Sequence, residues 1–520
     1  MFPTSPGGFA TTKELKEDFV SDLDGTTFGE VIALTLIIIF ASVLRKSLSS
    51  SFHRLEERVL RDKKSVRALS VDFAIVVLPG VLGLTLLSER SEEICVGLLV
   101  AASLCVVRSK QQQEWDDAST QKGHKVEYYS PLKRSVPSQA HATYVWDSLT
   151  EYRSILCLYT FISILAVDFK VFPRRFAKAE HYGTGLMDVG VGSFVISDAL
   201  FSRLDSASVQ DSEASAGKTS GGGGKKKGKD QTKKALATSL QLALVGVGRI
   251  VATKTISYHE HVGEYGVHWN FFLTLAIVKL VGLAVPIKAC GVVGILVAAS
   301  YQAALLLTGL GEYVNASQRD EGSLFSLNKE GVISLVGYAA LHCLARCFAY
   351  ATHLHSLTER SHSQITKKQM MGHRHFHLTA AFALGSWALA LLLDRTVEKV
   401  SRRSVNASYI FWVLANNLTW LFFIYLGRLL LDLDQCVPLL TAMNKFAFVL
   451  FIGANLLVGL VNSSVKTLEV GAPLAVATVT AYMGVLCILT HVLYLRTSKG
   501  KGKLFFLGKK RKAHSPQSEL

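Results

Sequence analysis

Residues 166–194, AVDFKVFPRRFAKAEHYGTGLMDVGVGSF, place a dense group of charges between two apolar runs. The runs on either side, 153–167 and 186–201, have roughly the length at which a helix with a rise of about 1.5 Å per residue crosses a bilayer core. An aspartate, two adjacent arginines and a lysine stand in the short connection between them. The pattern predicts two membrane helices joined by a charged loop.

Similar apolar runs recur along the whole chain of 520 residues, of which 49% are hydrophobic. With a mean hydropathy of +0.31, this composition is typical of a membrane protein and not of a soluble protein with several domains. We therefore predict an all-α, polytopic integral membrane protein with about 13 transmembrane helices. The predicted spans are 30–44, 69–88, 94–107, 153–167, 186–201, 235–256, 268–285, 289–310, 331–351, 377–394, 407–431, 441–461 and 470–495.

The spans also predict how the chain is divided. Residues 1–29 form a lumenal N-terminal segment that lacks the pattern of a removable signal peptide, so the first span is expected to act as a signal anchor. Membrane helices 1–5 occupy 30–201 and helices 6–13 occupy 235–495, followed by a basic cytosolic tail at 496–520. The stretch 202–234 is rich in glycine, serine and lysine, and predicts a disordered, basic cytosolic linker.

The basic residues show which side each loop occupies. Summed over alternate loops, about 34 lysines and arginines fall on one side of the membrane and about 14 on the other, which makes the richer side cytosolic. The N terminus is then lumenal, the C terminus cytosolic, and the loop after 153–167 lumenal. Three N-glycosylation sequons, at Asn315, Asn406 and Asn462, fall on the same lumenal side. Because this topology explains the net charge of +16, we expect no nucleic-acid partner.

Other polar features of the chain indicate structure more than chemistry. The eight cysteines lie within apolar runs and show no CxxC spacing, so we expect buried thiols and no metal site. The histidines of GHRHFH, at 373, 375 and 377, are expected to face lipid headgroups. Arg249 lies nearest the middle of a predicted span and is the best candidate for a charge inside the bundle. In the lumenal loop, Phe169, Phe172 and Phe176 alternate with the charges and are expected to hold them at the membrane surface; a solvated loop face is the alternative.

Several blocks of the sequence resemble one known family. ILAVDFKVFPRRFAKAEHYGTGLMDVGVGSFV closely resembles the signature block of the GPI inositol acyltransferases of the PIG-W type. KEDFVSDLDGTT, EYGVHWNFFLTLA, NKEGVISLVGYAALH and NLLVGLVNSSVKTL agree with the same family, so that the match runs from about residue 13 to about residue 495. The resemblance implies about thirteen membrane helices in the endoplasmic reticulum. It also implies transfer of a fatty acyl group, typically palmitoyl, from acyl-CoA to the inositol 2-hydroxyl of glucosaminyl-phosphatidylinositol. Acyl-CoA is then a co-substrate, and no permanently bound cofactor is expected.

Acyl transfer from a thioester to an alcohol requires a base, stabilisation of an oxyanion, and contacts to phosphate. The resemblance implies that Asp168 and Lys178 are the catalytic pair. Asp168 follows an apolar helix, where partial burial would improve it as a base. Lys178 could hold Asp168 ionised or polarise the thioester carbonyl. Arg174 and Arg175 have planar forks that suit a substrate phosphate; anchoring of lipid headgroups is the alternative.

Further candidates for substrate binding are Phe172 and Asp188 of the signature block, and Trp269 and Asn270 of EYGVHWNFF. His268, next to this pair, is a further candidate catalytic base. The donor poses a question of access, because acyl-CoA is cytosolic and Asp168 is predicted to be lumenal; either a cavity admits coenzyme A from the cytosol or a lumenal pool exists. The alternative function is a polytopic lipid or solute transporter, against which the absence of a visible internal repeat argues.

Overall fold

A computed structural model shows how these predicted spans are arranged. It describes residues 23–51, 66–121, 137–214, 223–256, 263–357, 364–431 and 436–498, together with Phe19. Within these ranges the ordered elements are helices, apart from a single isolated bridge between Gly25 and Thr184. The prediction of an all-α, polytopic membrane protein is confirmed.

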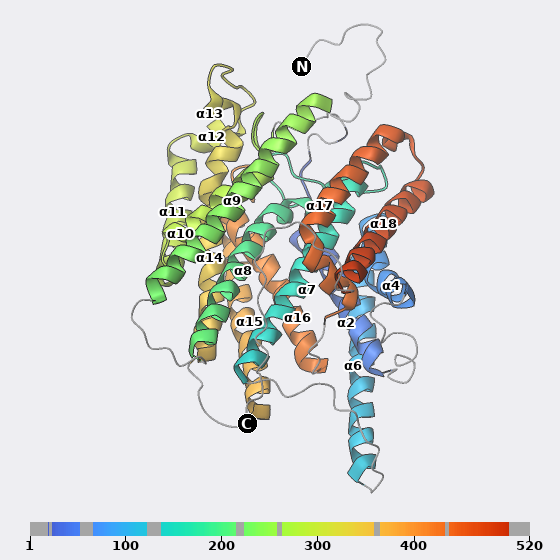
Figure 1. Ribbon diagram of the computed structural model, residues 1–520. Coiled ribbons are helices and arrows are strands. Elements are labelled where there is room, and N and C mark those ends of the chain that lie inside the picture. Colours follow the sequence, from blue (N-terminus) through green and yellow to red (C-terminus); the bar gives the residue numbers. More distant parts are fainter. Residues whose placement is uncertain are drawn as a thin grey trace.

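Figure 1 colours the helices in chain order, from blue to red. They are α2 (Phe28–Ser51), α4 (Val66–Asp72), α5 (Leu78–Leu84), α6 (Ser91–Gln121), α7 (Pro137–Ala166), α8 (Val189–Ala214), α9 (Gly223–Ile256), α10 (Phe271–Ala284), α11 (Cys290–Leu307), α12 (Leu310–Asn315), α13 (Leu324–Leu327), α14 (Lys329–Leu357), α15 (Gln364–Thr396), α16 (Ala407–Leu431), α17 (Pro438–Ser464) and α18 (Ala472–Ser498). A π-helical segment, Phe73–Val77, joins α4 to α5 without a break.

Every predicted span coincides with a helical segment. In the described part of the chain, 10 helices are long and apolar enough to cross a membrane. The other three predicted spans fall on α6, α8 and α10, which do not meet the same criteria of length and hydropathy. Helix α10 has 14 residues and is therefore about 21 Å long. A total of about 13 crossings thus stays a prediction.

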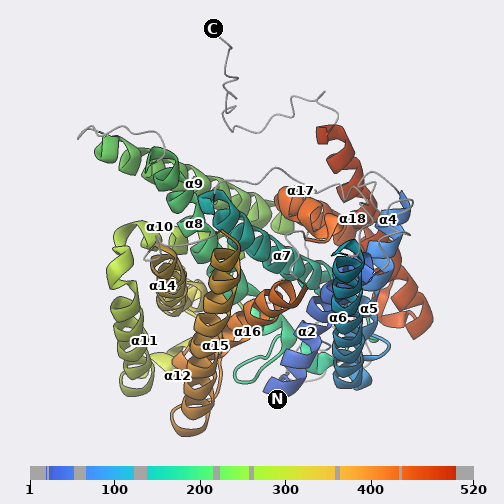
Figure 2. The same cartoon turned by 90° about the horizontal axis from the view of Figure 1, so that it is seen from below.

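The centre of the bundle is formed by the most enclosed helices. Figure 2 shows α2, α7 and α16 in the middle, with α9, α10, α11 and α14 on one side and α4, α5, α6, α17 and α18 on the other. Ile37 of α2, Tyr152 of α7 and Trp412 of α16 belong to one continuous core of buried side chains. Burial of such large apolar surfaces is what holds the loops at the helix ends in fixed positions.

Consecutive long helices alternate in direction, so their connections lie alternately at the two ends of the bundle (Figure 1). We call the end that carries the connections 167–188, 263–270, 308–328, 397–406 and 465–471 the head end. Backbone hydrogen bonds join these connections: Thr26 N–H donates to Thr184 O at 2.7 Å, and Gly183 N–H donates to Val400 O at 2.8 Å. Gly183 has a φ of +133°, and a Cβ there would lie 1.8 Å from Asp24 O, so only glycine fits this crossing.

Two features of the sequence, the stretch 202–234 and the sequon at Asn406, can be placed in the structure. The stretch 202–234 was predicted to be disordered, but α8 continues to Ala214 and α9 begins at Gly223, so that only 215–222 lie outside the described residues. The physical reason is that a charged, glycine-containing sequence next to an apolar helix can extend that helix by one hydrogen bond per residue. Extension avoids the free-energy cost of nucleating a new helix. Asn406, one of the three sequons on the predicted lumenal side, is fully buried.

Candidate functional site

The signature loop is folded around the guanidinium of Arg174. Its Nη2 donates to Val167 O at 2.9 Å and to Phe172 O at 3.0 Å, and its carbon Cζ lies 3.9 Å from the centre of the Phe19 ring. Burial lowers the pKa of Arg174 to about 10, an effect that the charge of Asp168 opposes. The buried Nη1 has no hydrogen-bond partner among the described residues. Most of the Arg174 guanidinium therefore holds the loop in its conformation, and only Nη1 is left for the predicted phosphate contact.

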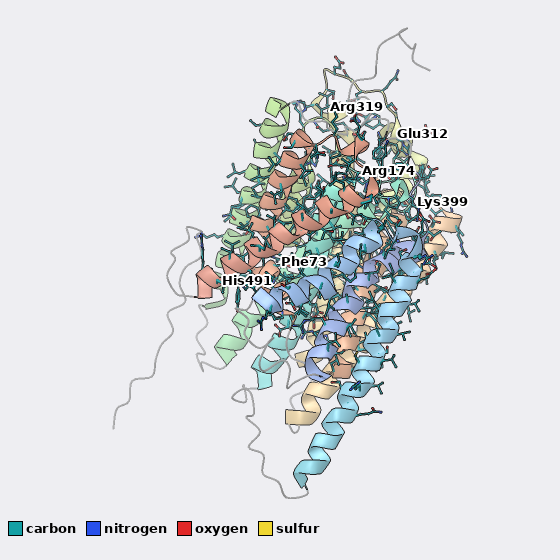
Figure 3. The ribbon with its side chains drawn as sticks, turned by 90° about the vertical axis from the view of Figure 1, so that its right-hand side faces the viewer. Phe73, Arg174, Glu312, Arg319, Lys399 and His491 are labelled. Carbon is teal, nitrogen blue, oxygen red and sulfur yellow. The ribbon has the colours of Figure 1, made fainter. Side chains whose placement is uncertain are left out.

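Arg175 points to two carboxylates from other parts of the head end. Its Nη2 and Nε donate to Glu30 at 2.9 and 3.1 Å, and its Nη1 donates to Glu89 at 2.9 Å. Charge-assisted, bidentate bonds of this kind fix a planar guanidinium firmly. Arg175 thus has two carboxylate partners within the protein, and its predicted contact with a substrate phosphate stays a prediction. Figure 3 shows Arg174 at this end with Arg319, Glu312 and Lys399, and His491 well below them.

The phenylalanines of the loop face inward. Phe169, Phe172 and Phe176 are all completely buried, and the rings of Phe172 and Phe176 meet edge to face at 5.9 Å. The rings are thus enclosed by protein and do not face the membrane surface as predicted, while a contact of Phe172 with substrate stays a prediction. The loop folds back on the bundle because this removes three aromatic rings from water.

Asp188 is also enclosed. Its Oδ2 accepts hydrogen bonds from the backbone N–H groups of Gly185 at 2.7 Å and Ala179 at 3.1 Å, while Oδ1 accepts from Arg402 Nε at 2.8 Å. Tyr409 Oη donates to the carbonyl oxygen of the same residue at 2.8 Å. With all these partners and no exposed surface, Asp188 joins two loops, and its predicted contact with substrate stays a prediction.

All three residues predicted from EYGVHWNFF have contacts within the fold, and the backbone N–H of His268 donates to Asn328 Oδ1 at 2.7 Å. Asn270 caps α10, since its Oδ1 accepts from Phe272 N–H at 3.0 Å, and its Nδ2 donates to Gly246 O at 2.9 Å. Trp269 Nε1 donates to Thr274 Oγ1 at 3.0 Å. His268 is half-buried at the head end, and its role as a base stays a prediction.

Asp168 occupies a different kind of position, half-buried at the point where α7 ends. Its Oδ2 accepts a hydrogen bond of 2.7 Å from Nδ2 of Asn462, which lies near the end of α17. Asp168 also interacts electrostatically with Arg174. A carboxylate that is both held and partly exposed can accept a proton from a bound hydroxyl.

Lys178 is the second partly exposed charge of the loop. Its Nζ donates to the two carboxylate oxygens of Glu264 at 2.5 and 2.7 Å, with 31% of the lysine side chain exposed. Burial lowers the pKa of Lys178, Glu264 opposes this, and Arg402 and Arg249 add to the lowering. Lys178 therefore has Glu264 as a carboxylate partner, where the sequence had suggested Asp168. Arg249, predicted to lie deep in a span, is instead exposed towards the end of α9.

Three residues of this arrangement were missed by sequence reasoning. Glu264 opens the block EYGVHWNFF and could have been noticed as an acidic group at a lumenal helix end. Asn462 was interpreted only as a sequon. Arg402 stands beside a second arginine, Arg403, whose Nη2 donates to the buried Glu330 at 3.1 Å. Two adjacent arginines in a short loop that is predicted to be lumenal oppose the usual charge bias, and this exception could have drawn attention to them.

The candidate site therefore comprises a carboxylate and an ammonium carried by one loop, the first bonded to Asn462 of α17 and the second to Glu264 of the connection before α10. Such a pair can remove a proton from an alcohol and stabilise negative charge on a neighbouring oxygen. In the described part of the chain, no group of three or more histidines, cysteines or acidic residues could hold a metal ion.

Comparison with known proteins gives these features a context. A family model described as GWT1 matches residues 12–493. The chain is 30% identical to the glucosaminyl-phosphatidylinositol-acyltransferase PIGW of Bos taurus, over 93% of this chain and 98% of the bovine protein. It is 32% identical to the GPI-anchored wall transfer protein 1 of Aspergillus oryzae, over 91% of this chain and 96% of the fungal one. A protein of the same description from Candida albicans is 29% identical over 91% of this chain and 96% of its own length.

Proposed function

Because this chain belongs to the GWT1 family, we propose that its head end carries out acyl transfer with Asp168 as the general base and Lys178 as the stabilising cation. The chain is a GPI inositol acyltransferase and acts in GPI-anchor biosynthesis. Its family implies an acyl donor and glucosaminyl-phosphatidylinositol as the acceptor. The roles of individual residues and the identity of the donor as palmitoyl-CoA are parts of the proposal.

One observation supports the two residues most directly. Phe172 and Asp188 have no exposed surface, and Asn270 is nearly as enclosed, whereas Asp168 and Lys178 remain partly exposed at the same end of the bundle. A catalytic group must touch substrate, so residual exposure distinguishes Asp168 and Lys178 from these three enclosed residues, although Arg174 and Arg175 are also partly exposed. The fixed partners of both residues also favour catalysis, since a positioned charge needs little reorganisation during the reaction.

The proposed reaction follows from ordinary acyl-transfer chemistry. The carboxylate of Asp168 accepts the proton of the inositol 2-hydroxyl while the hydroxyl oxygen attacks the thioester carbonyl carbon. The C–O bond forms, the carbonyl electrons move to oxygen, and the ammonium of Lys178 stabilises that oxyanion. The carbonyl then re-forms as the C–S bond breaks. The departing coenzyme A thiolate recovers the proton from Asp168, which returns to the carboxylate form.

The proposed location is the endoplasmic reticulum membrane, with the N terminus lumenal and the C terminus cytosolic. Basic loops at the opposite end from Asp168 support this orientation. Because acyl-CoA is cytosolic, a lumenal head end requires either a path for the donor through the protein or a lumenal pool of acyl-CoA. Conversion of acyl-CoA supplied only on the cytosolic side of sealed vesicles would support a path through the protein; conversion only after permeabilisation would support a lumenal pool.

The function is tested by incubating the purified protein in detergent with palmitoyl-CoA and glucosaminyl-phosphatidylinositol. Mass spectrometry should show a lipid heavier by one palmitoyl group, with release of free coenzyme A. Hydrolysis of the thioester without acylated lipid would contradict the assignment. Movement of the lipid across a reconstituted membrane without any acylation would instead favour the transporter.

A further inference from the structure

Asn462 contacts the proposed base from an unexpected direction. It lies near the end of α17, 294 residues after Asp168 in the chain, and its Nδ2 donates to Asp168 Oδ2 at 2.7 Å. With Ser463 and Ser464 it forms a sequon. The same nitrogen atom is thus both the potential acceptor of a glycan and the donor to Asp168.

The helix that carries Asn462 borders the outside of the bundle. Phe448, Ile452, Leu456 and Leu460 are exposed at intervals of four residues and form an apolar stripe along α17. Such a stripe is suited to lipid. Asp168 therefore lies at a seam between α7 and a lipid-facing helix, where an acceptor that is itself a lipid can approach from the side.

A general base needs a defined orientation as well as a charge. The carboxylate of Asp168 follows the end of α7, where rotation of the side chain would turn both oxygens away from a bound hydroxyl. A hydrogen bond to Oδ2 fixes the plane of the carboxylate and with it the direction of Oδ1. Small errors of orientation cost large factors in rate, because reacting groups must meet in a near-attack geometry.

We propose that Asn462 is a positioning residue for Asp168, and that its sequon carries no glycan in the active enzyme. The inference rests on the proposed role of Asp168 as the base. A glycan on Nδ2 would place a sugar against the carboxylate and displace the contact of 2.7 Å. The sequon is therefore a coincidence of a functional asparagine with a serine two residues later.

The test uses the purified full-length enzyme. Asn462→Ala should lower turnover by about 10- to 100-fold, the range for a hydrogen bond to a charged group, while the KM values for palmitoyl-CoA and the lipid acceptor stay within about twofold. Ser464→Ala is the matched control: it removes the sequon, keeps the amide and alters only an exposed side chain. It should leave turnover, KM and electrophoretic mobility unchanged.

A second comparison separates positioning from stability. In an Asp168→Ala background, Asn462→Ala should cause no further loss of residual turnover, because its partner is already absent. An equal loss in both backgrounds would show a structural role and overturn the proposal. The isosteric variant Asn462→Asp replaces the donor by a second carboxylate, and it should be at least as inactive as Asn462→Ala while keeping the thermal unfolding temperature; it carries the test if the alanine variant fails to fold.

Failure of this inference differs from failure of the proposed function. If Asp168→Asn abolishes turnover but Asn462→Ala and Asn462→Asp remain fully active, only the positioning role is lost. If Asp168→Asn itself keeps normal turnover, the base has been assigned wrongly. A glycopeptide carrying sugar on Asn462 in fully active enzyme would also overturn the inference.

Discussion

Lys178 and Glu264 form an ion pair in which one ammonium contacts both oxygens of one carboxylate, at 2.5 and 2.7 Å. The pair joins the signature loop to the connection that precedes α10. Burial lowers the pKa of Lys178 and the Glu264 carboxylate opposes this effect. Glu264 thus preserves the charge that the proposed mechanism requires, as well as orienting it.

The first prediction concerns this pair and the dependence of activity on pH. Turnover requires protonated Lys178, so it should fall as pH rises through the pKa of that lysine. Glu264→Gln removes the group that raises this pKa, and the alkaline limb of the pH–rate profile should therefore move to lower pH, with turnover at neutral pH reduced by about tenfold. Glu312→Gln, at an exposed site of the same end, should leave the profile in place. An unmoved limb in Glu264→Gln would contradict the assignment.

The second prediction concerns the reacting groups. Asp168→Asn keeps the size of the side chain but removes the base, and turnover should fall by about 10²–10⁴. Lys178→Ala should lower turnover by about 10²–10³. The double variant should lose much less than the product of the two factors, since both act in one transition state. Single-turnover rates on folded, monodisperse protein measure this; near-normal rates for Asp168→Asn would make His268 the next base to test.

The third prediction separates structural from substrate-binding roles in the signature loop. Asp188→Ala leaves the buried Arg402 without the carboxylate at 2.8 Å, and the folded state should lose about 3–5 kcal/mol. Thermal unfolding in detergent should show the loss directly. The protein that remains folded should keep its KM for both substrates. A raised KM with unchanged stability would support the prediction that Asp188 binds substrate.

The fourth prediction concerns the sequon at Asn406. Its Nδ2 donates to Lys399 O at 2.7 Å and to Glu398 at 3.1 Å, and its Oδ1 accepts from Tyr409 N–H at 3.0 Å. Peptide mapping should find this residue unmodified. Asn406→Ala should lower stability by about 1–3 kcal/mol, because it leaves buried polar groups without a partner. A glycan on Asn406 would mean that the 397–406 connection opens in the native protein.

The membrane helices could be predicted from the sequence because the length and hydropathy of each apolar run identify it without reference to the rest of the chain. The run predicted at 407–431 is the helix Ala407–Leu431. Helix ends in charged sequence were harder to predict: α9 includes KKKGKDQTKK, which has no apolar periodicity but continues from an apolar helix. Local hydropathy reports burial in lipid, and it does not report where a helix ends in water.

For the site, the sequence indicated the correct loop but not the division of roles within it. Asp168 and Asp188 are both aspartates beside apolar runs, and nothing local distinguishes them. Their partners do: Asn462 is 294 residues from Asp168, and Arg402 is 214 residues from Asp188. Whether a charge is enclosed or exposed depends on such distant contacts, which only the fold brings together.

The short helix α10 has a consequence for the surrounding bilayer. Its length of about 21 Å is less than the hydrocarbon thickness of a typical bilayer, about 30 Å. If α10 crosses the membrane as the sequence predicts, the mismatch is relieved by local thinning of the bilayer or by water and lipid headgroups that reach the turn after Ala284. The enzyme should therefore work best among short-chain lipids. Vesicles of increasing acyl-chain length offer a direct measure of this preference.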